Sequence, residues 1–565
     1  MNAPDDLAIG FAEHALTWAR NRGAAPEALA VLRVAAERVS QATAEGNVCI
    51  PLSAIADQFE GKAVGELREM LLASGMVGAP QGEVLPLVLD SANRLYLRRY
   101  FDHERRLAEN LVRRAREPDL SASAKEPGAR PDWQKVAVEH AMRRRLTVIS
   151  GGPGTGKTTT VAMLLARILG ENPAARIALA APTGKAAARM LDTLRDRAAS
   201  LPLQIRERLP AESHTIHRLL GVTPEAGRFR HDAKNPLPLD VLVVDEASML
   251  DLALAARLVE AVPEGARLVL LGDKDQLAAV EVGSVFAELS AKEDSPLAES
   301  VVWFTESHRF AADSGIGRLA ADINAGEPDR ALAWMAKGKD DGAAWLEDAG
   351  AEIALPTRKR ILDGYAAYLG ALRERIDDKA AVFRAFDRFR LLCAVRESPR
   401  GVRSLNRLLG GHARAALDHP LELGGRSPWY PGRPVMVMRN DYLLRLFNGD
   451  IGICLPGEDG QLAVWFPDQG AGFRALAPNR LPEHEDAWAI TVHKAQGSEF
   501  DALLCLLPEK SSPVMVRELL YTAVTRARSR VMLVGGTQVF RAACLTQTQR
   551  HAGLVERLRE AAGSE

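Results

Sequence analysis

The stretch Gly151-Gly-Pro-Gly-Thr-Gly-Lys-Thr158 fits the phosphate-loop pattern G-x-x-x-x-G-K-[ST] at every fixed position. An apolar run at 146–149 precedes it and helix-forming residues at 161–166 follow it, so the loop joins a strand to a helix. The glycines let backbone N–H groups turn toward a polyphosphate, which also meets the positive end of the helix. A glycine-rich surface turn would explain neither flank. The stretch therefore predicts a nucleoside triphosphate site, with Lys157 on the β- and γ-phosphates and Thr158 on Mg²⁺.

The composition is that of an ordinary soluble globular protein, because 47% of the 565 residues are hydrophobic and 26% are charged. The 72 basic and 73 acidic residues nearly cancel, so any nucleic-acid binding must use local basic surfaces. Five scattered cysteines form no C-x-x-C pair, which argues against a zinc site, an iron–sulfur cluster or a disulfide framework. No apolar run reaches membrane-spanning length, and we expect a cytoplasmic protein with no membrane contact.

The chain is expected to divide into several α/β and helical units. Residues 1–115 are predicted to form a mostly helical N-terminal domain, followed by a polar linker at 116–131. A first α/β domain is predicted at 132–308, because strand-length apolar runs alternate there with helical segments, as in a parallel sheet buried on both faces. A second α/β domain is predicted in two parts, 309–424 and 486–565, which are separated by a β-barrel insert at 425–485. The first domain is expected to carry a small hairpin insert at 222–239.

Two carboxylates, Asp245 and Glu246, close the apolar run 241–244. After a phosphate loop, such a pair predicts ATP hydrolysis, with Asp245 holding Mg²⁺ and Glu246 polarising the attacking water. A merely solvated strand end is the alternative. Gln276 ends the next strand and is a candidate sensor of the γ-phosphate, although a polar turn would have the same composition. Arg309 and Arg526 are candidate arginine fingers that would neutralise charge on the γ-phosphoryl group.

The chain carries, in this order, Gln134, the phosphate loop and the segments 181–186, 213–218, 244–249, 272–276, 306–309, 491–499 and 521–528. Together they resemble the complete motif set of a superfamily 1 DNA helicase. The residues at 215–220, at 277–283 and at 440–442 with 448–450 resemble those of the RecD branch, whose members are 5′→3′ motors. The resemblance implies two RecA-like domains with ATP between them and a small SH3-like barrel in the second.

The resemblance also implies roles for individual residues of the nucleotide site. Gln134 would recognise adenine, Glu499 would lie near the ribose, and Thr158 and Asp245 would hold Mg²⁺. The implied catalytic residues are Lys157, Asp245, Glu246, Gln276, Arg309 and Arg526. The implied phosphate-binding residues are Gly151, Gly152, Pro153, Gly154, Thr155, Gly156, Lys157, Thr158 and Thr159.

A track for single-stranded DNA is implied as well, and short hydroxyls with one Lys suit it because they grip phosphates without reading bases. Its residues would be Pro182, Thr183, Thr215, His217, Thr491, His493 and Lys494. For the two histidines, a ring satisfied within the fold is the alternative. Four aromatic residues near the insert could stack bases, but packing of a small barrel core is favoured for Trp429, Tyr430, Tyr442 and Phe447.

The N-terminal region bears on the partners. Its short length and the segment 45–52 resemble the RecD subunit of exonuclease V, which implies the RecC and RecB subunits of RecBCD as partners. The alternatives are a standalone RecD-like helicase, a regulatory ATP-binding subunit without motor activity, and an RNA helicase. The nearest approach to a nuclease site, Asp501 with Glu509 and Lys510, overlaps the helicase core, and we expect no intrinsic nuclease site.

Overall fold

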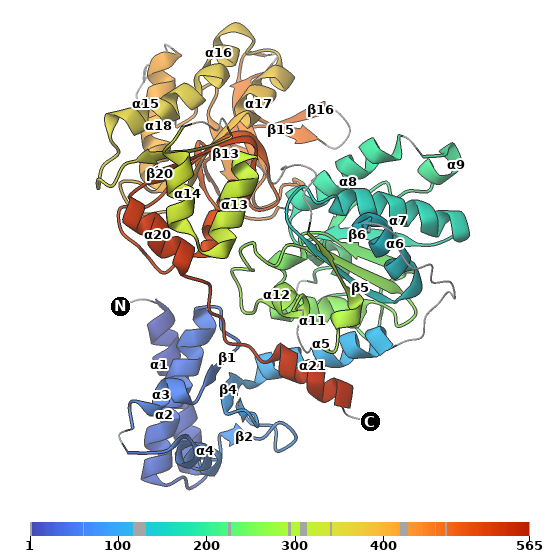
Figure 1. The fold of residues 1–565 in the computed structure, drawn as a ribbon, viewed down its shortest axis with the longest axis vertical. Helices are drawn as coiled ribbons and strands as arrows, with labels where there is room; N and C mark the ends of the chain where they lie inside the picture. The colour runs from blue at the N-terminus through green and yellow to red at the C-terminus, as the bar shows by residue number, and fades with distance from the viewer. Residues whose placement is uncertain are drawn as a thin grey trace.

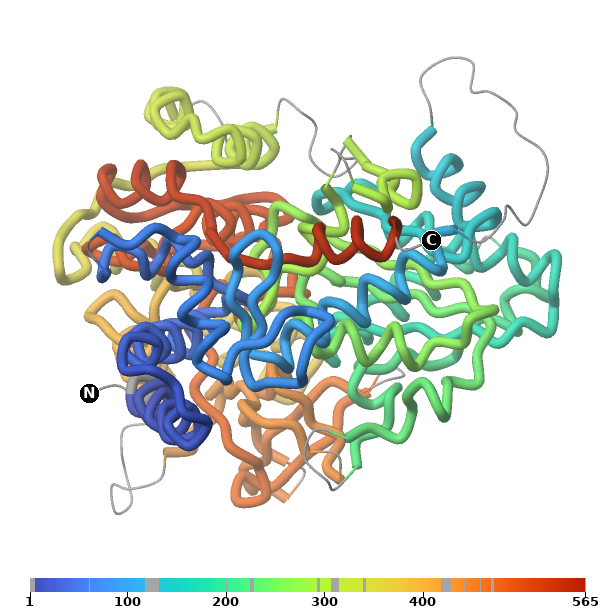
Figure 2. The backbone as a smooth tube through the Cα atoms, turned by 90° about the horizontal axis from the view of Figure 1, so that it is seen from below, coloured from blue at the N-terminus to red at the C-terminus, as the bar shows by residue number. Residues whose placement is uncertain are grey.

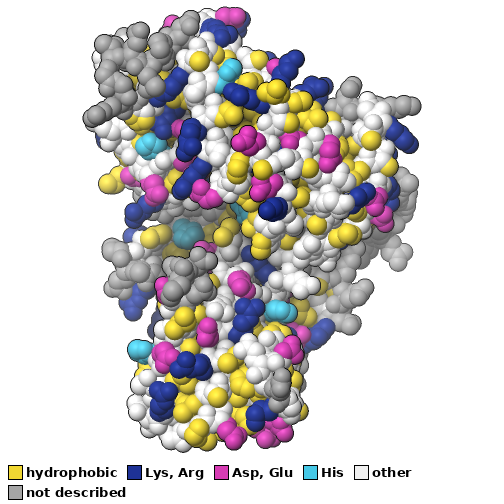
Figure 3. Space-filling view, turned by 90° about the vertical axis from the view of Figure 1, so that its left-hand side faces the viewer, with side chains coloured by type: hydrophobic (Ala, Val, Ile, Leu, Met, Phe, Trp, Pro, Cys, Tyr) yellow, Lys and Arg dark blue, Asp and Glu magenta, His cyan; other side chains and the backbone are white. Residues whose placement is uncertain are grey.

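The computed structural model describes residues 3–59, 61–116, 132–199, 201–223, 228–291, 295–305, 314–338, 342–417, 428–441, 443–457, 459–468 and 472–563. Two α/β bodies stand beside one another, and a smaller N-terminal unit lies below them in Figure 1. On the face shown in Figure 3, basic and acidic side chains are interspersed, and a narrower waist joins the lower lobe to the rest. This mixture agrees with a net charge of −1.

The N-terminal unit combines an antiparallel helix pair with a small mixed sheet, whose strand order is β1-β4-β3-β2. Helix α2 turns a stripe of small and branched side chains toward α1, including the fully buried Leu32 and Val39. Its elements are α1 (Ala3–Asn21), α2 (Pro26–Ala44), β1 (Cys49–Pro51), α3 (Ser53–Ala56), α4 (Val64–Ala73), β2 (Val77–Gly78), β3 (Leu87–Leu89), β4 (Arg94–Leu97) and α5 (Arg98–Arg116).

The first α/β body is a six-stranded parallel sheet of order β10-β5-β9-β8-β6-β7. Its near-continuous apolar strands are buried between helices on both faces, as the alternating pattern predicts. Its elements are α6 (Trp133–Arg143), β5 (Leu146–Gly151), α7 (Lys157–Glu171), β6 (Ile177–Ala181), α8 (Gly184–Ala198), α9 (Leu203–Arg206), β7 (His214–Thr215), α10 (Ile216–Leu220), β8 (Val241–Val244), η1 (Ala247–Met249), α11 (Leu252–Ala261), β9 (Arg267–Gly272), α12 (Val285–Leu289), η2 (Ala298–Ser300) and β10 (Val301–Phe304). Within 222–239, the expected hairpin is represented by one antiparallel bridge, Val222 with Phe229, and 224–227 lie outside the described residues.

The second α/β body has a five-stranded parallel sheet of order β11-β20-β19-β12-β18. The predicted pair of RecA-like domains is thus present. The elements of the second are α13 (Gly315–Ala325), α14 (Pro328–Met335), β11 (Ala343–Glu347), α15 (Leu355–Gly364), α16 (Ala366–Glu374), α17 (Lys379–Asp387), β12 (Phe389–Cys393), α18 (Val402–Ala416), β18 (Ala489–Thr491), η4 (His493–Ala495), β19 (Phe500–Leu506), α19 (Arg517–Thr525), β20 (Ala527–Gly535) and α20 (Thr537–Leu545).

The insert in the second domain is a five-stranded antiparallel sheet of order β16-β15-β14-β13-β17, with a small apolar core that includes Val435, Cys454 and Phe466. Among the strands that the structure describes, no pairing of β16 with β17 closes it, so the barrel stays a prediction. Its elements are β13 (Pro434–Val437), β14 (Ile451–Pro456), β15 (Leu462–Asp468), β16 (Gly472–Leu476), η3 (Pro478–Arg480) and β17 (His484–Asp486).

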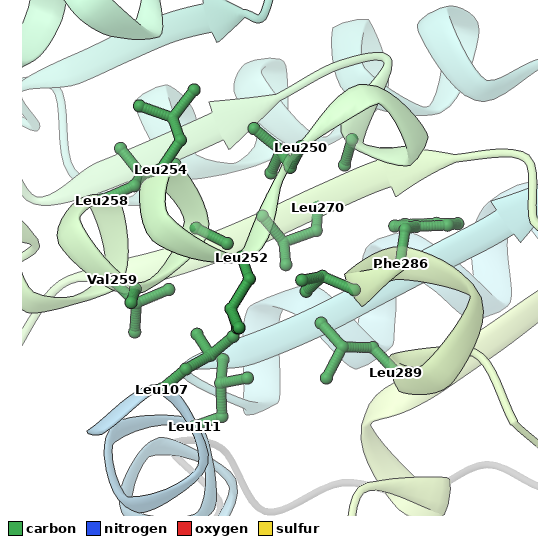
Figure 4. Packing of buried hydrophobic residues seen from close by; sticks show 14 of the residues in the cluster. Leu107, Leu111, Leu250, Leu252, Leu254, Leu258, Val259, Leu270, Phe286 and Leu289 are labelled. Carbon is green, nitrogen blue, oxygen red and sulfur yellow. The ribbon is translucent and has the colours of Figure 1, made fainter. Parts of the chain in front are cut away.

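Two helices pack on parts of the chain other than the domains to which the sequence assigned them. Helix α5, counted with the N-terminal domain, lays Leu107 and Leu111 against Leu252 and Val259 of α11 in the first RecA-like domain (Figure 4). Helix α21 (Leu554–Gly563), counted with the second domain, lies along α5, as Figures 1 and 2 both show. The apolar stripe of each helix marks a buried face but does not identify the surface that covers it. The domain boundaries therefore stay predictions.

Within the described ranges, no helix has the length and apolar character needed to cross a bilayer. All five cysteines are buried and carry free thiols.

Candidate active site

The phosphate loop runs from the carboxyl end of β5 into the first turn of α7. Gly154 and Gly156 have φ of 75° and 89°, in the left-handed region that glycine adopts without a Cβ penalty. The Lys157 ammonium folds back over the loop and donates to the carbonyl oxygens of Gly151 and Gly152 at 2.6 and 3.0 Å. The loop thus has the shape and the charge of an anion cradle.

The acidic pair follows β8, where Asp245 and Glu246 leave the same edge of the sheet. Glu246 has φ of 52°, an uncommon conformation for a non-glycine residue, and its N–H donates to Asp245 Oδ1 at 2.8 Å. Burial raises the pKa of Asp245 to about 6, with the Glu246 charge as a second cause, while Lys157 opposes the rise. No group of three or more His, Cys, Asp or Glu side chains in the described part of the chain forms a metal site alone. One carboxylate, a hydroxyl at Thr158 and phosphate oxygens are what Mg²⁺ uses in nucleotide sites, so the residues fit this ion.

Gln276 lies between the loop and the acidic pair because β9 separates β5 from β8 in the sheet. Its side-chain amide donates to Asp273 Oδ2 at 2.8 Å and accepts at 2.6 Å from Nη2 of Arg526, which comes from the second domain. Tyr521, also from the second domain, donates to the same Asp273 oxygen at 3.1 Å. A Cβ on Gly152 would lie 3.0 Å from the Tyr521 hydroxyl, so this tyrosine sits directly on the phosphate loop.

Arg526 is 2% exposed, and its guanidinium reaches Glu246 at 3.9 Å. The structure therefore brings the predicted finger to the predicted catalytic carboxylate from across the domain boundary. The other candidate finger, Arg309, lies outside the described residues. The structure adds Asp273 and Tyr521 to the site, and both fall within motifs quoted above. Their role depends on a contact between distant segments that spacing alone does not reveal.

Glu499 precedes β19, beside Arg526, because Phe500 and Ala527 are partners in the sheet register. Its carboxylate, 6% exposed, pairs with Arg189 from α8 of the first domain and with Arg528 at 3.2 Å. Arg189 also lies close enough to Asp245 to lower the pKa of that carboxyl, although burial outweighs it. Sequence reasoning missed Arg189, which lies on α8 with two other Arg residues and outside the motifs quoted above.

A cavity of about 1570 Å³ between the two RecA-like domains collects these groups. Its lining includes Gln134, Pro153, Gly154, Gly156, Lys157, Thr158, Thr159, Asp245, Glu246, Gln276, Glu499 and Arg526. Gly151, Gly152 and Thr155 are not among the lining residues and support the loop from beneath, where Thr155 Oγ1 donates to the Gly152 carbonyl at 2.9 Å. The cavity is large enough for a nucleoside triphosphate.

The three hydroxyl residues predicted for the DNA track have the same local geometry. Thr183 and Thr215 are the N-caps of α8 and α10 and accept from the backbone N–H groups of Ala186 and Arg218, each at 3.2 Å. Thr491 Oγ1 accepts from the N–H of Lys494 at 3.3 Å. Because each oxygen already accepts a hydrogen bond, its own O–H remains a donor suited to a phosphate. Pro182, which immediately precedes Thr183, is partly exposed at the end of β6.

The remaining track residues also have neighbours within the fold, although His217 is exposed and His493 and Lys494 are partly exposed. Burial lowers the pKa of His217, whose ring lies 5.9 Å from that of Phe229. Burial, followed by the charge of Arg550, lowers the pKa of His493. Lys494 donates to Asn448 of the insert at 2.7 Å. Burial thus lowers the pKa of both imidazoles, and the DNA-track roles of His217 and His493 stay predictions.

The aromatic residues near the insert have separate roles. Tyr430 is 5% exposed and accepts from the Trp488 indole N–H at 3.1 Å, and Trp429 packs on the insert core. Phe447 instead reaches the first domain, where a Cβ on Gly184 would lie 3.0 Å from its ring. Packing was the favoured expectation, and the first two residues agree with it. Tyr442 lies outside the described residues.

Two parallel sheets with a phosphate loop on one and an arginine from the other at the same cavity define a two-domain phosphate-loop ATPase of the helicase type. Residues 134–282 match an AAA domain, and residues 486–534 match a UvrD-like helicase C-terminal domain. The chain is 40% identical to the RecBCD enzyme subunit RecD of Mycolicibacterium smegmatis, over 91% of each chain. The chain belongs to the RecD family and is a superfamily 1 DNA helicase that binds a nucleotide, as the motif resemblance predicted.

Other similarities cover different shares of the two chains compared. The RecBCD enzyme subunit RecD of Haemophilus influenzae is 35% identical, over 75% of this chain and 72% of that one. The ATP-dependent RecD2 DNA helicase of Deinococcus radiodurans is 32% identical, over 82% of this chain and 59% of its own length. The solved structure of Bacteroides Pif1 bound to single-stranded DNA aligns with a TM-score of 0.41 at 18% identity, over 72% of this chain and 92% of that one.

Proposed function

We propose that this chain is an ATP-driven motor that moves 5′→3′ along single-stranded DNA, and that it works as the RecD subunit of RecBCD in the repair of double-strand breaks. The observation that carries the motor is the 2.6 Å contact between Arg526 and Gln276, because it joins the two domains at the point where the γ-phosphate would lie. A γ-phosphate bound there would take hydrogen bonds from both side chains, so its arrival and loss would change this contact and couple hydrolysis to domain movement.

In this proposal the hydrolytic step uses residues of both domains. Asp245 and Thr158 would hold Mg²⁺, which would neutralise charge on the phosphate oxygens when bound. Glu246 orients a water molecule for attack on the γ-phosphorus, the bond to the β-phosphate oxygen breaks, and ADP and inorganic phosphate leave. Lys157 and Arg526 stabilise the charge of the transferring group from opposite sides. Gln134, on α6 at the rim of the cavity, would contact the adenine.

Movement along DNA follows from the placement of the hydroxyl groups. Thr183 and Thr215 belong to the first domain, and Thr491 and Lys494 to the second. When the cavity closes on ATP and opens after hydrolysis, these two sets of phosphate contacts change their separation and can hold the strand in turn. The 5′→3′ direction rests on the RecD branch, and the sheets themselves do not set it.

The complex and the cellular role rest on the relatives. The proteins named RecBCD enzyme subunit RecD in Mycolicibacterium smegmatis and Haemophilus influenzae align with most of this chain, including part or all of its N-terminal unit in the first case. We propose that this unit docks on RecC, that RecB is the third subunit, and that the complex is cytoplasmic. We expect nuclease activity to belong to a partner subunit, as the family resemblance implies; Asp501 lies near the start of β19 and Glu509 follows its end.

The test is ATP-dependent displacement of streptavidin from single-stranded oligonucleotides that carry biotin at one end or the other, with Lys157→Gln as the hydrolysis-deficient control. We expect displacement from the 3′ end only, abolished in the variant. Displacement from the 5′ end only would overturn the direction. A normal ATPase rate in Lys157→Gln would overturn the site, and co-purification with RecC tests the complex separately.

A further inference from the structure

The chain segment after α20 crosses from the second RecA-like domain to the N-terminal unit (Figure 1). The carbonyl of His551 accepts from the N–H groups of Val48 and Cys49 at 2.8 and 3.2 Å, and its own N–H donates to Asn47 Oδ1 at 2.9 Å. The segment thus extends the start of β1 with backbone hydrogen bonds. Farther on, Arg557 pairs with Asp90 of the N-terminal sheet at 3.4 Å.

Arg550 lies where this segment meets the two RecA-like domains and the N-terminal unit. Its Nη1 donates to the carbonyl oxygens of Glu281 and Gly283 in the first domain, at 3.0 and 2.8 Å. A Cβ on Gly46 would lie only 3.0 Å from the guanidinium carbon, so the planar group rests directly on the N-terminal unit. The charge also reaches His493 of the second domain, where it adds to burial in lowering the pKa of the imidazole.

The loop 277–283 connects this point to the nucleotide cavity. It begins directly after Gln276. Both backbone polar groups of Leu277, its N–H and its carbonyl, form hydrogen bonds with the second domain. The Leu277 N–H donates to Thr522 Oγ1, and its carbonyl accepts from Gln496 Nε2, each at 2.9 Å. At the other end, the Gly283 N–H donates to the Gly46 carbonyl at 3.1 Å. A short loop that is hydrogen-bonded at both ends transmits a displacement from one end to the other, because its few residues have little conformational freedom to absorb it.

The geometry points to Arg550 as a positioning residue that couples the nucleotide cavity to the N-terminal unit. When Gln276 engages a γ-phosphate, the loop 277–283 shifts, and Arg550 and Gly46 carry that shift to residues 46–50. This inference rests on the proposed function of Gln276 as the γ-phosphate sensor. Because coupling between two sites is reciprocal, anything that binds and holds residues 46–50 would change nucleotide affinity by the same factor. The N-terminal unit would therefore respond to the ATP cycle while it docks a partner.

The test is hydrogen exchange of the full chain, alone, with Mg²⁺–ADP and with the non-hydrolysable analogue Mg²⁺–AMP-PNP. We expect AMP-PNP, but not ADP, to change exchange at residues 46–52 by at least threefold. Arg550→Ala should abolish that change and leave the basal ATPase rate within about twofold of the unaltered chain. Arg550→Lys should restore part of it, since an ammonium still donates to the carbonyls of 281 and 283. Arg541→Ala on α20 is the matched control, because it removes an exposed ion pair with Asp329 of α14.

Exchange at 46–52 that does not respond to AMP-PNP in the unaltered chain, with nucleotide binding verified by a fluorescent analogue, would overturn the coupling and leave the motor intact. A full response in Arg550→Ala would remove Arg550 from it. Failure of AMP-PNP to bind at all would overturn the proposed function first, and the coupling with it.

Discussion

Replacing Glu104 by Gln is expected to stabilise the fold at pH values above about 7. Glu104 is fully buried where α5 meets α21, and its Oε1 accepts from the Gly553 N–H at 2.8 Å. Within the described chain, its Oε2 has no hydrogen-bond partner. Burial raises the pKa of this carboxyl to about 7, although the Gly553 hydrogen bond and the charges of Arg557 and Arg94 lower it and Glu556 raises it further.

The sign follows from the proton that the folded state retains. In the unfolded chain the carboxyl ionises near 4.5, so between about pH 4.5 and 7 the folded protein holds a proton that the unfolded chain has released. The contribution of Glu104 to stability is therefore greatest below pH 4.5, falls as the pH rises through this window, and stays reduced above pH 7. A difference of roughly 2.5 in pKa corresponds to about 3 kcal/mol. Gln keeps the acceptor for Gly553 and carries no charge, so it removes this loss.

Urea denaturation of the unaltered chain and of Glu104→Gln between pH 5 and 8.5 measures the effect. The two free energies of unfolding should be similar at pH 5 and should separate to a constant gap above pH 7. Glu109→Gln, an exposed position on the same helix, serves as the control and should follow the unaltered chain. Parallel curves for Glu104→Gln, or a less stable variant at pH 8, would refute the reasoning.

Three further changes probe the site and the core. Arg526→Ala should lower the DNA-stimulated kcat of ATP hydrolysis by about 10³-fold, as expected for an arginine finger, whereas Arg530→Ala, at an exposed position on β20, should change it less than twofold; a loss below about tenfold would contradict the placement of Arg526 at the γ-phosphate. Arg189→Ala leaves Glu499 without its partner across the cavity and should raise the Kd of a fluorescent ATP analogue by about tenfold, and an unchanged Kd would separate this ion pair from nucleotide binding. Leu107→Ala opens a cavity beneath α11 and should lower the free energy of unfolding by about 2–5 kcal/mol in urea, so that a loss below about 1 kcal/mol would mean that the site collapses around the smaller side chain.

Local signals predicted the first domain well. The apolar runs at 146–150, 241–244 and 268–271 correspond to β5, β8 and β9 within a residue at each end. Each is a continuous strand buried on both faces, which leaves a strong signature in composition. Within the N-terminal region, which was expected to be mostly helical, the sequence pattern indicates only one short strand, at 84–89. The strands of the N-terminal sheet have two to four residues and are too short to display a period.

The residues of the site that could not be predicted from the sequence are those that form contacts between distant segments. Lys157, Asp245 and Glu246 belong to local motifs and were predicted with their neighbours. Arg189 meets Glu499, 310 residues away, and Arg550 meets Gly46 across most of the chain. Neither pairing has a periodic or spacing signal, because each depends on how two finished domains face one another. The covering of α5 by α21 has the same origin.

The packing of α21 on α5 also sets a schedule for biosynthesis. At translation rates of roughly 5–20 residues per second, α21 leaves the ribosome on the order of 20 to 90 seconds after α5. Until then, the face of α5 that Leu554 and Leu558 bury is exposed to solvent and to chaperones. The N-terminal unit thus reaches its final form only after both RecA-like domains have been synthesised, and a nascent chain stopped short of α21 would present a surface that quality-control proteases can recognise.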